Sequence, residues 1–296
     1  MTEITGRTAV VTGGGSGIGM GLAKALATAG ARVAVADIML SNAQGVVDTI
    51  RAEGGQAIAV ECDVCERSSI QAMKTAVHDA YGPVQLLFAN AGATSFDPLV
   101  EMSDEDVDWI LQVNLHGVIN TTRAFLPDMI AAGGGHICAT SSMAGLLPGW
   151  IPVHAPYSAA KAGVIGLMMN LALEVAEYDI HTTSYCPGGV ATGMKVNNSR
   201  YRPARFGGPA DGGVQVGEAS SVAHSHDFYT PEAVAPMVLD AVRHNRAFVF
   251  DHPAQRAHFR TTYSAVVEAC YDAAEQWHDY NGTPDANPHG AVLLKD

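Results

Sequence analysis

Three residues in the middle of the sequence have the types and spacing of a proton-transfer site. Tyr157 and Lys161 lie four positions apart at the start of an expected helix, so both side chains project from one face. A free tyrosine has a pKa of roughly 10, and a nearby ammonium group favours the phenolate and lowers that pKa. Ser142, at the end of an expected strand, can donate a hydrogen bond to a substrate oxygen. These residues suit acid–base catalysis at a hydroxyl or carbonyl group.

A glycine-rich stretch near the start, VVTGGGSGIGMG (residues 10–21), lies between an expected strand and an expected helix. In such a βαβ setting Gly13 permits a tight turn, Gly17 lets the backbone approach a pyrophosphate, and Gly19 lets helix and strand pack closely. The helix N-terminus adds unpaired N–H groups and a positive partial charge. We therefore predict a phosphate-binding loop for a dinucleotide rather than a flexible linker.

Short strands alternate with helices along the whole chain. The expected strands are Thr8–Thr12, Arg32–Asp37, Ala57–Cys62, Leu86–Ala89, His136–Ser141, Ile180–Tyr185 and Ala247–Asp251. Most are rich in Val and Ala without polar alternation, which is typical of a parallel sheet buried on both faces. Ser103 begins a capping box for a long helix that runs to Ile130. The pattern predicts an α/β fold: a Rossmann-type, doubly wound, seven-stranded parallel sheet with helices on both faces.

The chain divides into one catalytic domain, residues 1–252, and a C-terminal helical extension and tail, residues 253–296, with one helix expected over Pro253–Tyr280. Within the catalytic domain, residues 193–229 are glycine-rich and irregular. Loops of this length are usually functional or disordered. We expect residues 193–229 to form a substrate loop.

Composition limits the partners. The 296 residues are 48% hydrophobic and 16% charged, which suffices for a large core. The net charge of -13 argues against nucleic acid and against an anionic membrane. No apolar run approaches the roughly 20 residues of a membrane span. Five cysteines and no secretory signal pattern predict a cytoplasmic protein.

Five motifs, in chain order, resemble those of the short-chain dehydrogenase/reductase family, over about the first 250 residues. They are Thr12-Gly13-x-x-x-Gly17-x-Gly19, Cys62-Asp63-Val64, Asn90-Ala91-Gly92, Ser142 with Tyr157-x-x-x-Lys161, and Pro187-Gly188. The resemblance implies a catalytic tetrad of Asn114, Ser142, Tyr157 and Lys161. In it Tyr157 takes the hydroxyl proton while hydride passes to NAD⁺, Lys161 binds the nicotinamide ribose, and Asn114 holds a water linking Lys161 to solvent.

The cofactor predicted is NAD. Asp37, at the end of the second strand, can accept hydrogen bonds from a ribose diol and would repel a 2′-phosphate. Family members that prefer NADP usually carry a basic residue where this chain has Ser16 or Ile38-Met39. The expected cofactor-binding residues are Gly13, Ser16, Gly17, Ile18, Gly19, Asp37, Asp63, Val64, Asn90, Ala91, Gly92, Tyr157, Lys161, Pro187, Gly188, Val190 and Thr192. By resemblance, Asp63 and Val64 would contact the adenine and Thr192 the nicotinamide amide.

The expected substrate is a secondary alcohol or the matching ketone. Met143, Leu147, His154, Gly188, Gly189 and Met194 should frame its pocket, into which the loop LLPGWIPVHAP bulges. The long substrate loop and the extension favour a large, partly apolar molecule. The stretches DVDWILQVNLHGVINTTRAFLPDMIAAG and YRPARFG resemble bacterial dehydrogenases that oxidise the benzylic Cα alcohol of lignin-derived aryl ethers. We predict an aryl or bulky alicyclic alcohol.

Two alternatives stay open. One is a hydroxysteroid or terpenol dehydrogenase of the same family. The other is a non-catalytic NAD(H)-binding regulator, against which the complete tetrad counts. The resemblance also implies a homodimer or homotetramer packed through the helices Ser103–Ile130 and Tyr157–Tyr178. We expect no metal, and we interpret the Cys62-x-x-Cys65 spacing as coincidental because no second cysteine pair exists.

Overall fold

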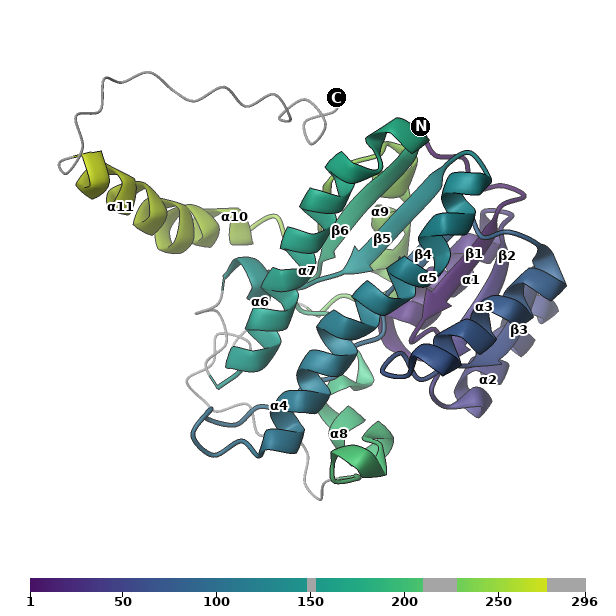
Figure 1. Ribbon diagram of the computed structural model, residues 1–296, viewed down its shortest axis with the longest axis horizontal. Helices are drawn as coiled ribbons and strands as arrows, with labels where there is room; N and C mark the ends of the chain where they lie inside the picture. Colours follow the sequence, from purple (N-terminus) through teal and green to yellow (C-terminus); the bar gives the residue numbers. More distant parts are fainter. Residues whose placement is uncertain (148–152, 210–227, 276–296) are drawn as a thin grey trace.

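The computed structural model describes residues 1–147, 153–209 and 228–275, with an open parallel sheet at its centre (Figure 1). The strands are β1 (Thr8–Thr12), β2 (Arg32–Asp37), β3 (Gln56–Glu61), β4 (Leu86–Ala89), β5 (Gly135–Thr140), β6 (Ile180–Cys186) and β7 (Phe248–Phe250). Their order in the sheet is β3-β2-β1-β4-β5-β6-β7, and every neighbouring pair is parallel. The predicted Rossmann-type, seven-stranded sheet is confirmed.

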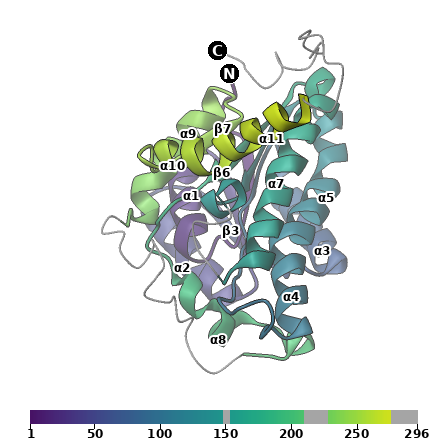
Figure 2. The same ribbon diagram turned by 90° about the vertical axis from the view of Figure 1, so that its left-hand side faces the viewer.

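Two layers of helices flank the sheet (Figure 2). One layer has α1 (Gly17–Thr28), α2 (Leu40–Ala52) and α9 (Pro231–Arg243); the other has α3 (Arg67–Tyr81), α5 (Gly117–Ala131) and α7 (Ala155–Glu174). Successive residues of a strand point to opposite faces, so Ala9 and Val11 of β1 enter the core under the first layer and Val10 enters the core under the second. Both faces are therefore buried, as the apolar strands predict.

The strand order reverses between the neighbouring strands β1 and β4. From β1 the chain continues to β2 and β3 toward one edge of the sheet, and from β4 it continues to β5, β6 and β7 toward the other edge. In open α/β sheets ligands bind outside the carboxyl ends of the strands at such a reversal. Here the residues that follow these two ends are Gly13 and Asn90. The fold alone thus points to the glycine-rich loop and the Asn90-Ala91-Gly92 turn as one site.

The long helix predicted from Ser103 is interrupted. Ser103 caps it as expected, because its hydroxyl accepts from the Asp106 N–H while the Asp106 carboxylate accepts from the Ser103 N–H. However, α4 (Asp104–Leu111) runs into a π-helical turn, η1 (Gln112–His116), before α5 begins. A π-turn holds an extra residue and is frequent at functional sites. This one contains Asn114.

Short helices make up the rest of the described chain. They are α6 (Met143–Leu146), η2 (Ala176–Tyr178), η3 (Gly193–Val196), α8 (Asn197–Tyr201), η4 (Ala204–Phe206), α10 (Gln255–His258), η5 (Phe259–Ser264) and α11 (Ala265–Glu275). The start of the predicted irregular loop is therefore helical, and its residues 210–227 lie outside the described part. The extension projects from the sheet domain (Figure 1), and a π-turn, η5, interrupts its predicted single helix. No helix within the described ranges has the length and hydropathy to span a membrane.

Candidate active site

The glycine-rich loop is shaped by close backbone approach. Gly13 and Gly17 have φ angles of 62° and 49°, a region that side-chain-bearing residues rarely adopt. A Cβ on Gly19 would lie 2.1 Å from the Gly13 carbonyl oxygen and 2.6 Å from Asn90 Nδ2. Ser16 precedes α1 without its side chain capping the helix, so it leaves the first-turn N–H groups to other partners. The loop has the form of a phosphate-binding turn.

Asp37 lies at the carboxyl end of β2 beside this loop. Its Oδ2 accepts from the Gly15 N–H at 2.9 Å, and its Oδ1 accepts from the Met39 N–H at 3.0 Å. The carboxylate is buried, and burial raises its pKa although both backbone donors act in the opposite direction. Two backbone donors hold the carboxylate in one orientation at the edge of the cavity.

One cavity, of about 210 Å³, unites the predicted cofactor site. Every predicted cofactor-binding residue except Gly19 lines it, and Gly19 instead sits under the loop against Gly13. The lining also includes residues that the sequence analysis did not single out, among them Trp109, Val113, Asn197, Tyr201 and Pro203. Trp109 and Val113 lie in the first quoted stretch of resemblance and Tyr201 and Pro203 in the second, but nothing in these stretches assigned them to the cavity.

Helix α7 carries Tyr157 and Lys161 to the inner wall of the cavity. Lys161 Nζ donates to the Thr140 carbonyl oxygen at 2.8 Å and lies 5.4 Å from the centre of the Tyr157 ring. Ser142, the residue that precedes α6, acts on the phenol in the direction of a lower pKa, and Met194 Sδ lies 3.9 Å from the phenol oxygen. Tyr157, Lys161 and Ser142 are therefore brought together as predicted.

Asn114 is fully buried within the π-turn η1. Its Nδ2 donates to the Ala93 carbonyl at 2.6 Å and to the Ile110 carbonyl at 2.8 Å, and its Oδ1 accepts from the Ala93 N–H at 3.3 Å. Asn114 thus ties the α4–α5 helix to the chain that follows β4. Its proposed water contact with Lys161 stays a prediction.

Burial controls the ionisation of the two central groups. It raises the pKa of Tyr157 to about 12 and lowers the pKa of Lys161 to about 7. In the protein without a dinucleotide, burial is the largest influence on the phenol and opposes its ionisation. The lowering of the phenol pKa by Lys161 together with the positive nicotinamide ring stays a prediction.

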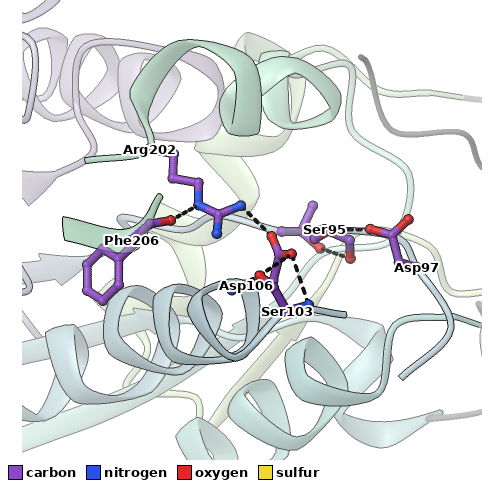
Figure 3. Close-up of polar contacts among 7 residues, drawn as sticks. Ser95, Asp97, Ser103, Asp106, Arg202 and Phe206 are labelled. Carbon is purple, nitrogen blue, oxygen red and sulfur yellow. Dashed lines mark hydrogen bonds and ion pairs between the residues drawn. The ribbon is translucent and has the colours of Figure 1, made fainter. Parts of the chain in front are cut away.

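The segment that follows β6 covers one side of the cavity; we call residues 192–208 the covering segment. Arg202 is buried, with its Nη1 2.5 Å from Asp106 Oδ1 and its Cζ 5.8 Å from the centre of the Trp109 ring. Its Nε also donates to the Phe206 carbonyl. Figure 3 shows Arg202 between Phe206 and the start of α4, where Ser103 also bonds Asp106. Arg202 joins the covering segment to the helix that presents Trp109.

Other side-chain pairs attach the covering segment to α2 and to the chain between β3 and α3. Asn42 Nδ2 donates to the Tyr201 hydroxyl at 3.2 Å. Arg205 Nη2 lies 2.6 Å from Asp63 Oδ2, and its Nε lies 3.3 Å from Glu66 Oε1. The predicted adenine contact, Asp63, therefore already pairs with an arginine.

The predicted substrate residues divide into three groups. Gly188 and Met194 line the cavity. Met143 and Leu147 pack in an apolar cluster that reaches Phe259 of the extension. His154 and Gly189 are buried outside the cavity lining. Residues 148–152 of the loop predicted to bulge into the pocket lie outside the described residues.

Among the described residues, the Cys62-x-x-Cys65 pair forms neither a disulfide nor part of a metal-binding cluster. No group of three or more His, Cys, Asp or Glu in these ranges is arranged to hold a metal ion. Cys62 and Cys65 are both free, and burial raises the pKa of each thiol to about 12. At neutral pH both are therefore protonated and poor nucleophiles.

A parallel sheet with a glycine turn at its reversal and a Tyr–Lys pair facing that turn defines a dinucleotide-dependent oxidoreductase. The family model described as "short chain dehydrogenase" matches residues 7–202, and the chain belongs to this family. Among curated proteins, the C alpha-dehydrogenase of Sphingobium sp. strain SYK-6 is 31% identical over 91% of this chain and 88% of its own length. The predicted family is confirmed.

Solved structures of relatives contain either dinucleotide. A short-chain dehydrogenase/reductase from Burkholderia phymatum in complex with NAD has a TM-score of 0.82 at 29% identity, covering 97% of this chain and 100% of the other. A metagenomic short-chain oxidoreductase in complex with NADP has a TM-score of 0.60 at 36% identity, covering 64% of this chain and 85% of the other. The choice between the two dinucleotides therefore depends on this chain's own residues.

Proposed function

We propose that this protein is an NAD-dependent dehydrogenase that transfers hydride between a secondary alcohol, aryl or bulky alicyclic, and NAD. The observation that carries the proposal is that Tyr157 and Lys161 lie side by side on the wall of a cavity that the glycine-rich loop also lines. A binding protein without catalysis would need the loop but not the Tyr–Lys pair.

The residues present fit a dinucleotide. The loop packs closely against Thr192 because Gly17 lacks a side chain; a Cβ there would lie 3.2 Å from Thr192 Cβ. Asp37 supports NAD over NADP, since its carboxylate is fixed where a 2′-phosphate would meet a like charge. When bound, NAD⁺ supplies the hydride acceptor and a positive ring that favours the phenolate.

The protein's own side chains handle the proton. The Tyr157 phenolate removes the proton from the substrate alcohol, and in the reverse direction the Tyr157 phenol gives it to the carbonyl oxygen. Ser142 donates a hydrogen bond to the same substrate oxygen and stabilises its developing charge. Lys161, anchored by the Thr140 carbonyl, binds the nicotinamide ribose and keeps a donor near the phenol. The buried surroundings exclude water from this exchange.

Apolar residues that line the cavity outside the five family motifs support the proposed substrate class. Trp109, Val113 and Met194 line the cavity, which favours an apolar, flat or bulky group beside the carbinol carbon. The similarity to a C alpha-dehydrogenase supports the aryl reading. We further propose a cytoplasmic homodimer or homotetramer, to be tested by light scattering of the purified chain.

The test is a turnover assay with NAD⁺ or NADP⁺ and a panel of benzylic, steroidal, terpenoid and short aliphatic secondary alcohols. We expect NAD-linked turnover on the benzylic set, and Asp37→Ala should reduce the preference for NAD. Turnover only on steroids or terpenols would retain the mechanism and replace the substrate. Absence of turnover with NADH binding intact would instead favour a regulator.

A further inference from the structure

A histidine ring packs against the phenol of Tyr157. The ring centres of His154 and Tyr157 are 4.5 Å apart at an interplanar angle of 20°. The opposite face of His154 stacks on Phe96, at 4.6 Å and 9°. His154 is only 4% exposed. Phe96, from a distant part of the chain, therefore forms one stack with His154 and Tyr157 that ends at the group proposed to move the proton.

The chain accepts two local costs to place His154 there. Val153, directly before it, has φ of 58°, a strained conformation for a β-branched residue. His154 is also the N-cap of α7, yet its side chain caps no N–H, although Ser, Thr, Asp or Asn would do so. Both the strained Val153 and the missing side-chain cap reduce stability at the same point of the chain. Their coincidence indicates that the sequence maintains the position of the His154 ring rather than a well-capped start of α7.

The other side of the stack is fixed as well. Phe96 lies in the chain that follows β4, between buried Ser95 and exposed Asp97. Ser95 Oγ donates to Asp97 Oδ2 at 2.6 Å (Figure 3), and this bond links the two residues that flank Phe96 in the sequence. The hydrogen bond between its two neighbours therefore restrains the backbone that carries the Phe96 ring.

The imidazole has no acid–base role at neutral pH. Burial lowers the pKa of His154 to about 4, so the ring is neutral and brings no charge to the phenol. Its Nδ1 is buried and has no hydrogen-bond partner among the described residues. What the ring contributes is its flat surface, which excludes water from one face of Tyr157 and limits rotation of the phenol.

We propose that His154, supported by Phe96, is a positioning residue that holds the Tyr157 ring in its reactive orientation and shields it from water. The proposal rests on the proposed function, in which Tyr157 is the acid–base group. The other groups against the phenol are Lys161, which can carry charge, and the neutral Ser142 and Met194. A change in the titration of Tyr157 after removal of the imidazole therefore reports the loss of shielding.

The test compares His154→Phe, which keeps a flat ring, with His154→Ala, which removes it. Misplacing a reactive group by about 1 Å can cost roughly 100-fold, so we expect kcat of His154→Ala to fall about 10- to 100-fold while the NADH Kd is unchanged. His154→Phe should restore most of the loss. Phe96→Ala, which removes the outer ring, should lower kcat in the same direction by less.

The pH dependence separates positioning from a general loss of structure. Because burial raises the phenol pKa, admitting water in His154→Ala lowers it again toward the ordinary value of roughly 10. The rising limb of kcat/KM for alcohol oxidation should move to lower pH. Ultraviolet difference titration, each protein minus its Tyr157→Phe counterpart, measures the same phenol without turnover.

Two results would overturn the proposal: wild-type kcat and phenol titration in His154→Ala, or equal loss in His154→Phe and His154→Ala, which would assign the effect to a ring nitrogen. Should wild type oxidise no alcohol, the proposed function fails, and the difference titration still decides whether the stack shields Tyr157. If His154→Ala does not fold, Phe96→Ala and His154→Phe decide by the same criteria.

Discussion

The cavity has two walls that are built in different ways. The cofactor wall, formed by the glycine-rich loop with Asp37 and Asn90, is made by backbone that approaches backbone, as where a Gly19 Cβ would lie 2.1 Å from a carbonyl oxygen. The covering segment is held by side-chain pairs whose partners are far apart in the sequence. The separations are 96 positions for Arg202 and Asp106, 142 for Arg205 and Asp63, and 159 for Tyr201 and Asn42. One wall therefore depends on residue types at fixed local spacing, and the other on single long-range partners.

This difference sets the expected response to substitution. Added atoms in the cofactor wall meet backbone, which cannot move aside, so their effects are steric and large. Removing one partner from the covering segment leaves the other pairs in place, so those effects are graded. The following predictions test this contrast, beginning with Tyr157, which lines the same cavity as both walls.

Tyr157→Phe should have the largest effect. Removing the phenol oxygen removes the proton acceptor, and general acid–base catalysis contributes about 100- to 10,000-fold, so kcat should fall by that order. The NADH Kd, measured by fluorescence titration, should stay unchanged because the ring remains. Tyr271→Phe, at an exposed position in the extension, is the matched control. Appreciable turnover by Tyr157→Phe would remove Tyr157 from the mechanism.

Gly19→Ala should come second. Overpacking costs about 1–3 kcal/mol, and at roughly 1.4 kcal/mol per tenfold the NADH Kd should rise about 10- to 100-fold. The control is Gly45→Ala in α2, where an added Cβ meets nothing within 4 Å and the helix should become slightly more stable. If Gly19→Ala bound NADH with wild-type affinity, the backbone of the glycine-rich loop would be able to move aside for the added methyl group. The proposed contrast between a rigid cofactor wall and a graded covering segment would then be wrong.

The sequence predicts the cofactor wall well because each requirement there is local. Gly13, Gly17 and Gly19 follow a strand at fixed spacing, and Asp37 ends the next strand, so type and position suffice to assign them. Strand order follows for the same reason, since alternating strands and helices leave few topologies. Strand ends shift by a residue, as where the predicted strand Ala57–Cys62 is Gln56–Glu61 in the structure.

The covering wall could not be predicted in the same way. Arg202 was visible within YRPARFG, but nothing local indicates Asp106 as its partner. The π-turn at Asn114 does not follow from a helical period, and the stacking of His154 depends on Phe96, which is 58 positions away by residue number. Such contacts are set by tertiary packing, which a single sequence does not display.

Arg202→Met should have an intermediate effect. It leaves Asp106 without its buried partner and frees the covering segment from α4, so we expect kcat/KM for the alcohol to fall about tenfold, as in moderate buried-pair losses of about 1.4 kcal/mol or more. The NADH Kd should change less. Pairing it with Asp106→Asn in a double-mutant cycle measures the coupling, and strict additivity would mean that the ion pair does not hold the segment.

Arg205→Met should have the smallest effect, and its sign is informative. The Arg205 and Asp63 side chains are 39% and 19% exposed, and pairs of this kind contribute about 0–1 kcal/mol, so the melting temperature should hardly change. Removing Arg205 frees Asp63 Oδ2, while the Cys65 N–H still orients Oδ1 at 2.9 Å, so the carboxylate stays in place to accept from the adenine.

We therefore expect Arg205→Met to bind NADH a few-fold more tightly at low salt. The difference should shrink at high salt, because screening weakens the Arg205–Asp63 pair in the wild type as well. Arg205→Lys, which keeps the charge, is the control and should behave like the wild type. A tenfold loss of NADH affinity would show that this pair supports the cofactor site as firmly as the glycines do, and the contrast between the two walls would then fail at the point where they meet over Asp63.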